Sequence, residues 1–226
     1  MEKLSFKNLL PYIIALVTFA TLSLVYFYPL LEGYKLVQSD IEKHKSLSHE
    51  IASHKDKYDE NALWSGNMFA GMPTYLTTKI KYSGNIVKYL LVAAKGGLPH
   101  PASAIFAYLL GFFILFLCLR INPWLAIVGA IAFAFSSYFL IIIEAGHNSK
   151  IYAIAFMGPI LGGFIEVIRG KIRVGALLIA IFTALELYVN HVQITYYLFF
   201  ILLFVGVAEL ITAVKSGALK EFSKRI

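Results

Sequence analysis

Apolar residues occur along this chain in long blocks separated by short polar stretches, and most blocks have the length of one membrane crossing. A helix needs roughly 20 apolar residues to span the hydrocarbon core of a bilayer, which is about 30 Å thick. We therefore expect an all-α polytopic membrane protein, built as a single module over residues 1–226. The blocks predict six transmembrane helices, at residues 9–31, 102–119, 124–143, 151–168, 174–189 and 194–214.

The longest polar stretch, residues 32–101, is predicted to be a large loop that carries helices outside the hydrocarbon. The apolar residues of its first half share one helical face: Ile41, Leu47, Ile51 and Tyr58. Lysines and acidic residues surround that face, which indicates an amphipathic helix over 41–58 resting on the membrane surface. Residues 86–94 predict a second short interfacial helix. Between the two, ALWSGNMFAGMPTYL combines helix breakers with large aromatic residues and predicts a compact aromatic loop.

The lysines and arginines of the short connections predict the orientation in the membrane. One alternating set of connections carries nearly all of them: Lys3, Lys7, Arg120, Arg169, Lys171, Arg173, Lys215, Lys220, Lys224 and Arg225. By the positive-inside rule these connections are cytoplasmic, and long loops such as 32–101 do not count against the rule. The N-terminal block is too long for a signal peptide and has no cleavage site. We therefore expect a multi-pass protein of the cytoplasmic membrane with both ends of this chain inside the cell.

Composition agrees with this interpretation and excludes one other class. The chain is 59% hydrophobic and only 15% charged, which is unlike a soluble domain. Its net charge of +7 comes from residues scattered among the loops, so no basic stripe for nucleic acid is present. The single cysteine, Cys118, excludes an intrachain disulfide. The basic ending LKEFSKRI resembles the approach to another membrane segment, so we expect the N-terminal part of a longer protein.

Ionisable residues in membrane helices need a partner or a task, because inserting one costs about 2.5–3.5 kcal/mol at the helix centre. Glu166 and Glu209 lie near basic residues at the cytoplasmic boundary, where pairing or solvation accounts for them. Glu144 and Glu186 belong to the opposite end of their helices. Glu186 lies one turn before Asn190, so it either forms hydrogen bonds between helices or belongs to a polar pocket that opens outward.

Three polar clusters fall on the same, external side of the membrane by helix counting. They are Asp40, the GHNSK stretch at 146–150 and the NHVQ stretch at 190–193. Asp40 has two interpretations, because a residue just before a helical stretch is often an N-cap, whereas a carboxylate held beside the membrane can be a reactive group. The histidines at 44, 49 and 54 are five residues apart, which does not match a helical zinc pair.

Four stretches of this sequence resemble the YfhO-like membrane proteins of the GT-C glycosyltransferase superfamily. They are QSDI at 38–41, LWSGNMFAGMPTY at 63–75, AGHNSKIYAIAFMGP at 145–159 and NHVQITYY at 190–197. The resemblance implies a GT-C-like N-terminal module and a polyprenyl-phosphate-linked sugar as donor. It implies transfer of that sugar to a glycan or lipid acceptor on the outer face of the membrane.

The resemblance also assigns roles to residues of this chain. The acidic catalytic residue of the first external loop would be Asp40, acting as general base or helping to hold a divalent cation such as Mg²⁺ or Mn²⁺. The loop has no Asp-x-Asp pair, so no motif requires a metal ion. The expected carrier-phosphate and substrate-binding residues are His147, Asn148, Lys150, Glu186, Asn190, His191, Trp64 and Tyr75. The two aromatic residues could equally pack in the core of their loop.

Two other functions fit the same pattern. A transporter or flippase would explain a glutamate inside a membrane helix, and such proteins often contain broken helices. The sequence offers Gly158-Pro159 as a candidate break. A non-catalytic assembly subunit is the third class. The enzyme hypothesis makes a geometric prediction. Asp40 should share one outward-facing cavity with at least two of His147, Lys150, Glu186, Asn190 and His191. The helix over 41–58 should lie along the membrane surface with Leu47 and Ile51 buried.

Overall fold

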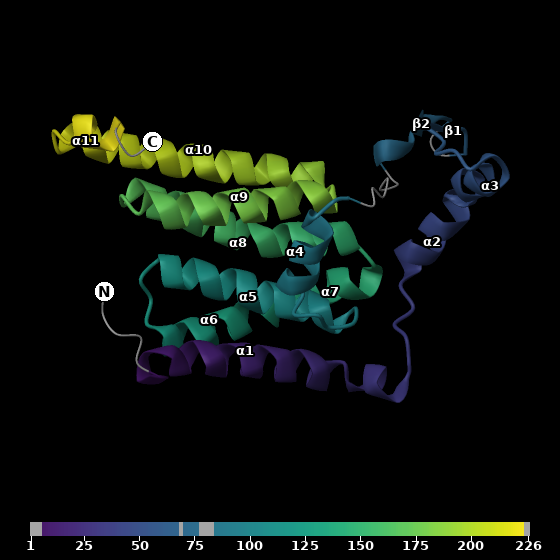
Figure 1. The fold of residues 1–226 in the computed structure, drawn as a ribbon, viewed down its shortest axis with the longest axis horizontal. Coiled ribbons are helices and arrows are strands. Elements are labelled where there is room, and N and C mark those ends of the chain that lie inside the picture. The colour runs from purple at the N-terminus through teal and green to yellow at the C-terminus, as the bar shows by residue number, and fades with distance from the viewer. Residues whose placement is uncertain (1–5, 68–69, 77–83, 224–226) are drawn as a thin grey trace.

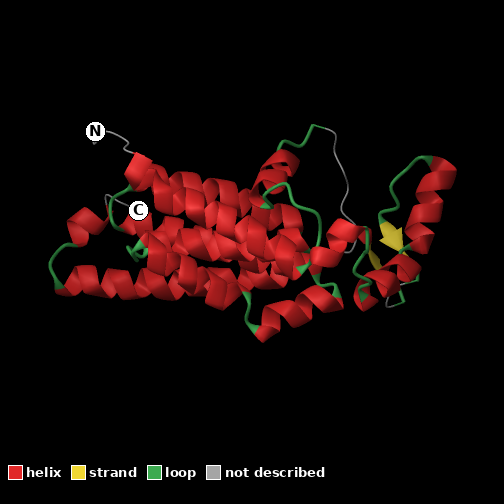
Figure 2. Cartoon of the chain, turned by 90° about the horizontal axis from the view of Figure 1, so that it is seen from below, coloured by secondary structure: helices red, strands yellow, loops and turns green. Residues whose placement is uncertain are grey.

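The computed structural model describes residues 6–67, 70–76 and 84–223, and nearly all of its regular structure is helical (Figure 1). The long apolar helices lie side by side in one bundle. They are α1 (Phe6–Tyr26), α5 (Ala102–Cys118), α6 (Pro123–Ala134), α7 (Ser137–Ala145), α8 (Asn148–Ile168), α9 (Ile172–Val189) and α10 (Val192–Lys215). In the described residues, the only strands are β1 (Trp64–Ser65) and β2 (Met72–Pro73), which form a short antiparallel ladder (Figure 2). The predicted all-α fold is confirmed.

Several helices have the length and composition of membrane spans. Helices α1, α8, α9 and α10 meet both conditions, and the bent pair α6–α7 makes a fifth if it is counted as one span. Helix α5 is apolar but has only 17 residues. The prediction of a protein with several possible membrane crossings is therefore confirmed at the level of four to five helices.

The predicted single helix over 124–143 is wrong. The chain bends by 51° between α6 and α7, where Ser136 takes an extended conformation and begins a new helix at Ser137. Serine is among the residues preferred at helix N-caps, and Ser136 takes that position here without a capping hydrogen bond from its hydroxyl. Helix α8, by contrast, runs without a break through Pro159, so the candidate break at 158–159 that the transporter alternative offered is not a break in the structure.

The first predicted span, 9–31, also ends earlier than expected. Helix α1 ends at Tyr26 and is followed by a 3-10 turn, η1 (Tyr28–Glu32). Pro29 accounts for the ending, because proline lacks an amide hydrogen and disfavours a helical conformation in the residue before it. Gly33 then adopts a left-handed conformation and directs the chain back toward the bundle.

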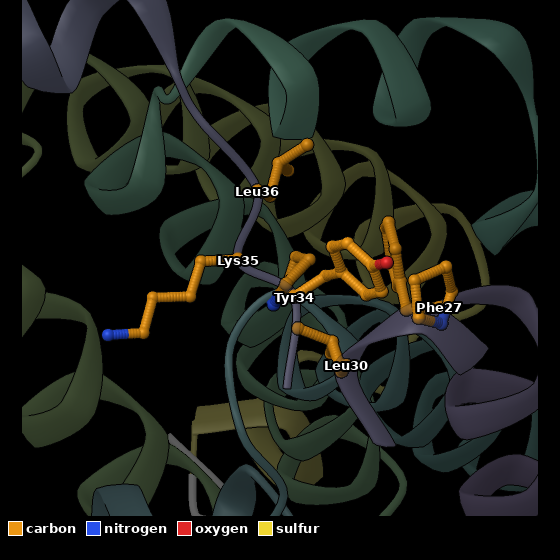
Figure 3. Close-up of a pocket in the computed structure, with 7 residues that line it drawn as sticks. Phe27, Leu30, Tyr34, Lys35 and Leu36 are labelled. Atoms are coloured by element: carbon orange, nitrogen blue, oxygen red, sulfur yellow. The ribbon is translucent and has the colours of Figure 1, made fainter. Parts of the chain in front are cut away.

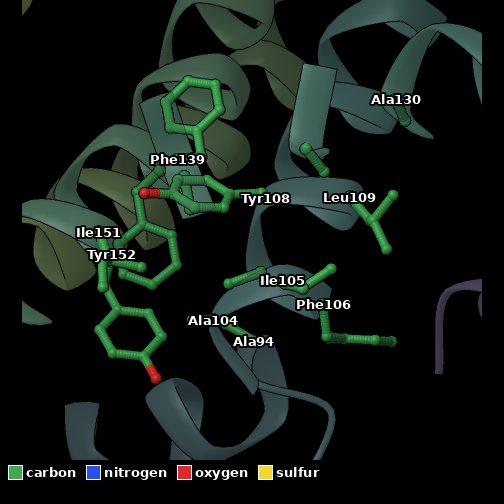
Figure 4. Close-up of a cluster of buried hydrophobic side chains, with 14 of the residues drawn as sticks. Ala94, Ala104, Ile105, Phe106, Tyr108, Leu109, Ala130, Phe139, Ile151 and Tyr152 are labelled. Atoms are coloured by element: carbon green, nitrogen blue, oxygen red, sulfur yellow. The ribbon is translucent and has the colours of Figure 1, made fainter. Parts of the chain in front are cut away.

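Helix α8 is the centre of the bundle, whereas α1 and α10 lie at opposite edges (Figure 1). A β-carbon at Gly111 of α5 would collide with the backbone of α8, and one at Gly175 of α9 would collide with that of Gly163. Small residues at these crossings let the helices pack backbone to backbone, as is common in membranes. The buried cluster around Tyr108 joins α5, α6, α7 and α8 (Figure 4).

The described residues of 34–101, between α1 and α5, lie at one end of the bundle, and α2, α3 and the strands project from it (Figure 1). We call these residues the external segment and this end of the bundle the loop end. The external segment contains α2 (Ser39–Leu47), α3 (His49–Tyr58), the β1–β2 ladder, the 3-10 turn η2 (Thr74–Leu76) and α4 (Val87–Ala94). Helix α4 packs on α9. The start of α1 and the short helix α11 (Leu219–Ser223) lie at the opposite, terminal end (Figure 1).

The amphipathic helix predicted over 41–58 is two helices, because the chain breaks at Ser48. Ile51 is buried as expected, but Leu47 is 46% exposed and Tyr58 is 55% exposed. The apolar residues of 41–58 therefore do not form one continuous buried face. Glu50 at the start of α3 instead accepts hydrogen bonds from Ser65, Gly66 and Asn67 of the aromatic loop.

At the terminal end, Glu166 is buried in an ion-pair cluster with Arg120 and Lys171. One guanidinium nitrogen of Arg120 lies 3.0 Å from Oε1 of Glu166, and Nζ of Lys171 lies 3.7 Å from Oε2. The boundary pairing expected for Glu166 therefore exists. The neighbouring Arg169 donates instead to the carbonyl of Cys118. These contacts tie α5, α8 and α9 together.

Candidate functional site

Asp40 lies against the loop end of the bundle. It is the second residue of α2, and the N-cap of that helix is Gln38. The interpretation of Asp40 as an N-cap in open solvent is therefore wrong. The extended residues after Gly33 bring the start of α2 onto the connection between α7 and α8, so the carboxylate faces a polar loop of the bundle.

An open cavity of about 390 Å³ borders Asp40. Three parts of the chain that are distant in sequence contribute to its lining: the start of α2, the α7–α8 connection and the α9–α10 connection. The lining residues are Asp40, Ile41, His44, Gly146, His147, Asn148, Ser149, Lys150 and His191. Five of the nine nominated site residues are among them, whereas Glu186, Asn190, Trp64 and Tyr75 are not.

The carboxylate of Asp40 has two nearby nitrogen groups. Nδ1 of His147 lies 3.4 Å from one oxygen, and Nζ of Lys43 lies 3.7 Å from the other. The Asp40 side chain is 38% exposed and that of Lys43 is 74% exposed, so the lysine contact is a weak surface pair. Asp40 therefore keeps access to the cavity while His147 limits its position.

Lys150 and His191 supply hydrogen-bond donors at the same cavity. Nζ of Lys150 lies 5.3 Å from the ring centre of Tyr138, a cation–π contact that holds the ammonium near the cavity. Nδ1 of His191 accepts a hydrogen bond from the backbone N–H of Ile194. Burial lowers the pKa of His191, and the charges of Lys150 and His147 act in the same direction. Because Nδ1 accepts from Ile194, the hydrogen-bond donor that the His191 ring has left for the cavity is Nε2–H.

Asn148 lines the cavity, but its side chain is engaged with Gln38. The two amides exchange hydrogen bonds in both directions, each 3.3 Å long. Gln38 also donates to the backbone carbonyl of Ile143 and is only 5% exposed. The substrate-binding role expected for Asn148 therefore has a structural competitor. Gln38 was given no role by the sequence, because no pattern links it to a partner 110 residues away.

Glu186 is fully buried and belongs to the interior of the bundle. Thr195 of α10 donates a hydrogen bond to its Oε1 at 3.2 Å. In the part of the chain that the structure describes, Oε2 has no hydrogen-bond partner. The structure thus supports the interhelical hydrogen bond expected as one alternative, and Glu186 does not line the Asp40 cavity.

Asn190 ends α9 in a left-handed conformation and ties the aromatic loop to the bundle. Its side-chain amide donates to the backbone carbonyl of Tyr75 at 2.9 Å. The side chains of Trp64 and Tyr75 are 62% and 63% exposed, so of the two alternatives, sugar stacking and packing in a loop core, the structure contradicts the second. Neither ring borders the cavity, because the aromatic loop folds against α3 through Glu50 instead. Residues 68–69 of that loop lie outside the described residues.

Two apolar pockets lie next to the segment that carries Gln38. The first, of about 170 Å³, is lined by Phe27, Pro29, Leu30, Tyr34, Lys35, Leu36 and Pro101, and Figure 3 shows the Lys35 ammonium extending away from the aromatic rings. The second, of about 260 Å³, shares Phe27 and Leu36 with it and is lined by Ile143 and Glu144 as well. The two apolar pockets and the polar cavity thus adjoin the same short stretch of chain, residues 34–41.

Metal binding receives no positive support from the geometry. Across residues 6–67, 70–76 and 84–223, no group of three His, Cys, Asp or Glu side chains is placed to hold a metal ion. The divalent cation considered from the family resemblance therefore remains without identified ligands. The comparisons add no assignment, since no protein-family model, no curated protein and no solved structure matches this chain.

Proposed function

We propose that this chain is the N-terminal module of a membrane glycosyltransferase that moves a sugar from a polyprenyl-phosphate carrier to a glycan or lipid acceptor. The observation that carries the proposal is the shared cavity of Asp40, His147, Lys150 and His191. A half-exposed carboxylate beside three nitrogen donors is a combination suited to proton removal at one position and charge stabilisation at another.

The chemistry assigns a separate task to each side of the cavity. Asp40 accepts the proton of the acceptor hydroxyl as its oxygen attacks the anomeric carbon of the sugar. The bond between that carbon and the carrier phosphate breaks, and its electron pair remains on the phosphate. Lys150 and His191 donate hydrogen bonds to the phosphate oxygens, which stabilises the negative charge of the leaving group.

The surroundings of the cavity suit a lipid-linked donor. The two apolar pockets lined by Phe27 and Leu36 adjoin the chain segment that leads to Asp40, and an isoprenoid tail could occupy them. In this proposal α5 and the bent pair α6–α7 also cross the membrane, which gives six crossings. The positive-inside rule places the terminal end in the cytoplasm and the cavity at the outer face of the cytoplasmic membrane.

The resemblance to YfhO-like GT-C proteins supports the same function. The QSDI stretch contributes Gln38 and Asp40, and the GHNSK stretch contributes His147, Asn148 and Lys150 to one region. Two of the quoted stretches thus meet at the cavity. A third, NHVQITYY, contributes His191.

A transporter is the second candidate, and two observations favour it. Glu186 is a fully buried carboxyl group inside a candidate membrane helix, and its Oε2 has no hydrogen-bond partner among the described residues. Such groups often mark ion or proton pathways. Helices α6 and α7 meet at a bend of 51°, as in a broken span or a re-entrant loop, and broken membrane helices form the substrate sites of many transporters. Neither feature borders the Asp40 cavity, so the enzyme remains the better supported proposal.

The test is the replacement Asp40→Asn in the full-length protein, assayed in membranes with radiolabelled polyprenyl-phosphate sugars. Loss of a general base is expected to reduce turnover by about 100- to 10,000-fold. Asp56→Asn is the matched control, because it removes a carboxylate of α3 that does not line the cavity. Normal turnover by the Asp40 variant would refute the enzyme assignment.

Two other outcomes would favour the alternative functions. Substrate uptake by liposomes that contain the protein, without sugar transfer, would favour the transporter. If the protein shows neither activity and Asp40 can be replaced without effect, an assembly subunit is favoured.

A further inference from the structure

The pairing of Gln38 with Asn148 joins the external segment to the bundle at one point. Gln38 is the N-cap residue of α2, but its side chain makes no capping hydrogen bond to that helix. It turns instead toward the α7–α8 connection, where it reaches the carbonyl of Ile143 and the amide of Asn148. A polar side chain that is 5% exposed and engaged at both ends of its amide is held in one position.

The end of α7 explains why a glutamine fits here. The last carbonyls of a helix have no partner within that helix, and the N–H groups of Gly146 and His147 both donate to Ile142. The Ile143 carbonyl is left for an external donor, which Gln38 supplies. The Ile143 carbonyl orients the side-chain amide of Gln38. The Nε2 of this amide points toward α7, and its Oε1 accepts a hydrogen bond from Asn148.

The backbone at Gly146 fits closely around the same contact. Its φ of +97° is a conformation that L side chains rarely adopt. A β-carbon there would lie 2.9 Å from the β-carbon of Gln38 and 3.1 Å from Cγ1 of Ile41. The glycine therefore allows the external segment to approach the connection that carries His147.

We propose that Gln38 and Asn148 form a latch that positions Asp40 against His147, an inference that rests on the proposed function. Asp40 follows Gln38 by two residues, and His147 precedes Asn148 by one. The two hydrogen-bonded amides thus fix the two chain segments that carry Asp40 and His147, whose side chains are 3.4 Å apart. Gln38 is a positioning residue, because it does not line the cavity and so would not contact a substrate bound there.

The first test measures the contact itself and needs no substrate. In membranes containing the full-length protein, the pair Gln38→Cys with Asn148→Cys is treated with a short bifunctional methanethiosulfonate reagent. Bridging is detected by mass spectrometry of the linked peptides. The pair Val37→Cys with Asn148→Cys is the matched control, because Val37 is adjacent but 77% exposed. We expect at least tenfold more bridging for the Gln38 pair, and equal bridging would overturn the latch.

The second test uses an exchange of the two amides. Gln38→Asn and Asn148→Gln each change the reach by one methylene, whereas the double variant restores the combined length. We expect each single variant to lower kcat by about 10- to 100-fold with little change in KM, since a displacement near 1 Å at the reacting group has that effect. We expect the exchanged pair to recover most of that loss, which a general loss of folding would not permit.

The third test alters the fit without touching a polar group. Gly146→Ala should lower kcat in the same way, because the added methyl group displaces Gln38. Gly33→Ala is the matched control, with a φ of +88° and no atom within 4 Å of the added carbon. Turnover is measured beside Asp40→Asn. If Asp40→Asn abolishes transfer while the Gln38, Asn148 and Gly146 variants are unchanged, the latch is refuted and the proposed function stands. Equal turnover of Asp40→Asn and the unaltered protein refutes both.

Discussion

Two carboxylates at opposite ends of the bundle each face two cationic or titratable side chains, but their access differs. Glu166 at the terminal end is 4% exposed and lies 3.0 Å from Arg120. Asp40 at the loop end is 38% exposed and lies 3.4 Å from His147 and 3.7 Å from Lys43, and this second distance equals that between Glu166 and Lys171. Asp40 borders the cavity of about 390 Å³ at the loop end, and Glu166 is not among the residues that line that cavity.

Glu166 is thus part of a structural ion pair, whereas Asp40 is a candidate reactive group. The ion pairs of the buried Glu166 carboxylate join the ends of three helices, so these contacts serve packing. The segment that carries Asp40 is held by the side-chain hydrogen bonds between Gln38 and Asn148. The Asp40 carboxylate itself stays partly exposed, so it can still meet another molecule. Burial and pairing alone would have favoured Glu166 as the site, and access to an open cavity favours Asp40.

The largest expected effect is that replacing Asp40 lowers activity but not stability, whereas replacing Glu166 lowers stability but not activity. Asp40→Asn should lower sugar transfer by about 100-fold or more and leave the thermal unfolding midpoint nearly unchanged. Glu166→Gln should leave kcat within about threefold but reduce stability by about 1–3 kcal/mol, because it leaves two cations without their partner and both are half exposed. Transfer assays and thermal unfolding in detergent measure the two effects. Similar behaviour of both variants would contradict the distinction.

The cations of the two ends should differ next. Lys150→Gln is expected to lower kcat/KM by about 10- to 100-fold, since it removes a charged donor to the carrier phosphate. Lys171→Gln removes a lysine of the same charge from the Glu166 cluster and should have no effect on transfer. Kinetics over a range of donor concentrations would show the difference. An equal loss in the two variants would indicate a general electrostatic effect of the protein's charge.

A smaller effect concerns pH. The lowered pKa of His191 means that the unfolded chain binds this proton more readily than the folded chain. The protein should therefore lose stability as pH falls below about 6.5, the ordinary imidazole pKa, and the loss should level off below the folded pKa. His191→Asn keeps a cap acceptor for Ile194 without titrating. Its unfolding midpoint should fall by a few degrees less than that of the unaltered protein between pH 7.5 and 5.5, and an equal fall would exclude this origin.

The smallest predicted effect lies in the external segment. Hydrogen bonds from Ser65 and from the N–H groups of Asn67 and Gly66 lower the pKa of Glu50. Glu50→Gln weakens these charge-assisted bonds, so limited proteolysis of the loop after residue 60 should become a few times faster. Glu42→Gln is the control, because Glu42 forms only an exposed pair with Lys45. No difference in cleavage rate between the two variants would show that Glu50 does not hold the loop.

Much of the helical architecture was predictable from local pattern. The apolar blocks placed every long helix, and Asn122-Pro123 marks the start of α6, where Asn122 accepts a hydrogen bond from the backbone of Trp124. The break at Ser136 was missed, because the residues on both sides of it are equally apolar and hydropathy does not register backbone direction. The division at Ser48 was missed for a related reason, since the helical period continues through it.

The candidate site was predictable in part. Counting helices placed Asp40, His147, Lys150 and His191 at one end of the bundle, because each lies just after or before an apolar block. The exclusion of Glu186 from the cavity could not be inferred, since it depends on which face of α9 packs against α10. Gln38 was overlooked because a glutamine in a polar stretch has no distinctive pattern.

The sequence by itself determined which segments are apolar helices and at which end each polar cluster lies, because hydrophobic burial acts on long blocks and tolerates local variation. The tertiary structure alone decided which polar groups meet. Hydrogen bonds and ion pairs require atoms within about 3–4 Å, and the pairs Gln38–Asn148, Asp40–His147 and Arg120–Glu166 join residues far apart in the chain. Their formation depends on helix rotation and on the path of the external segment, which no local pattern specifies.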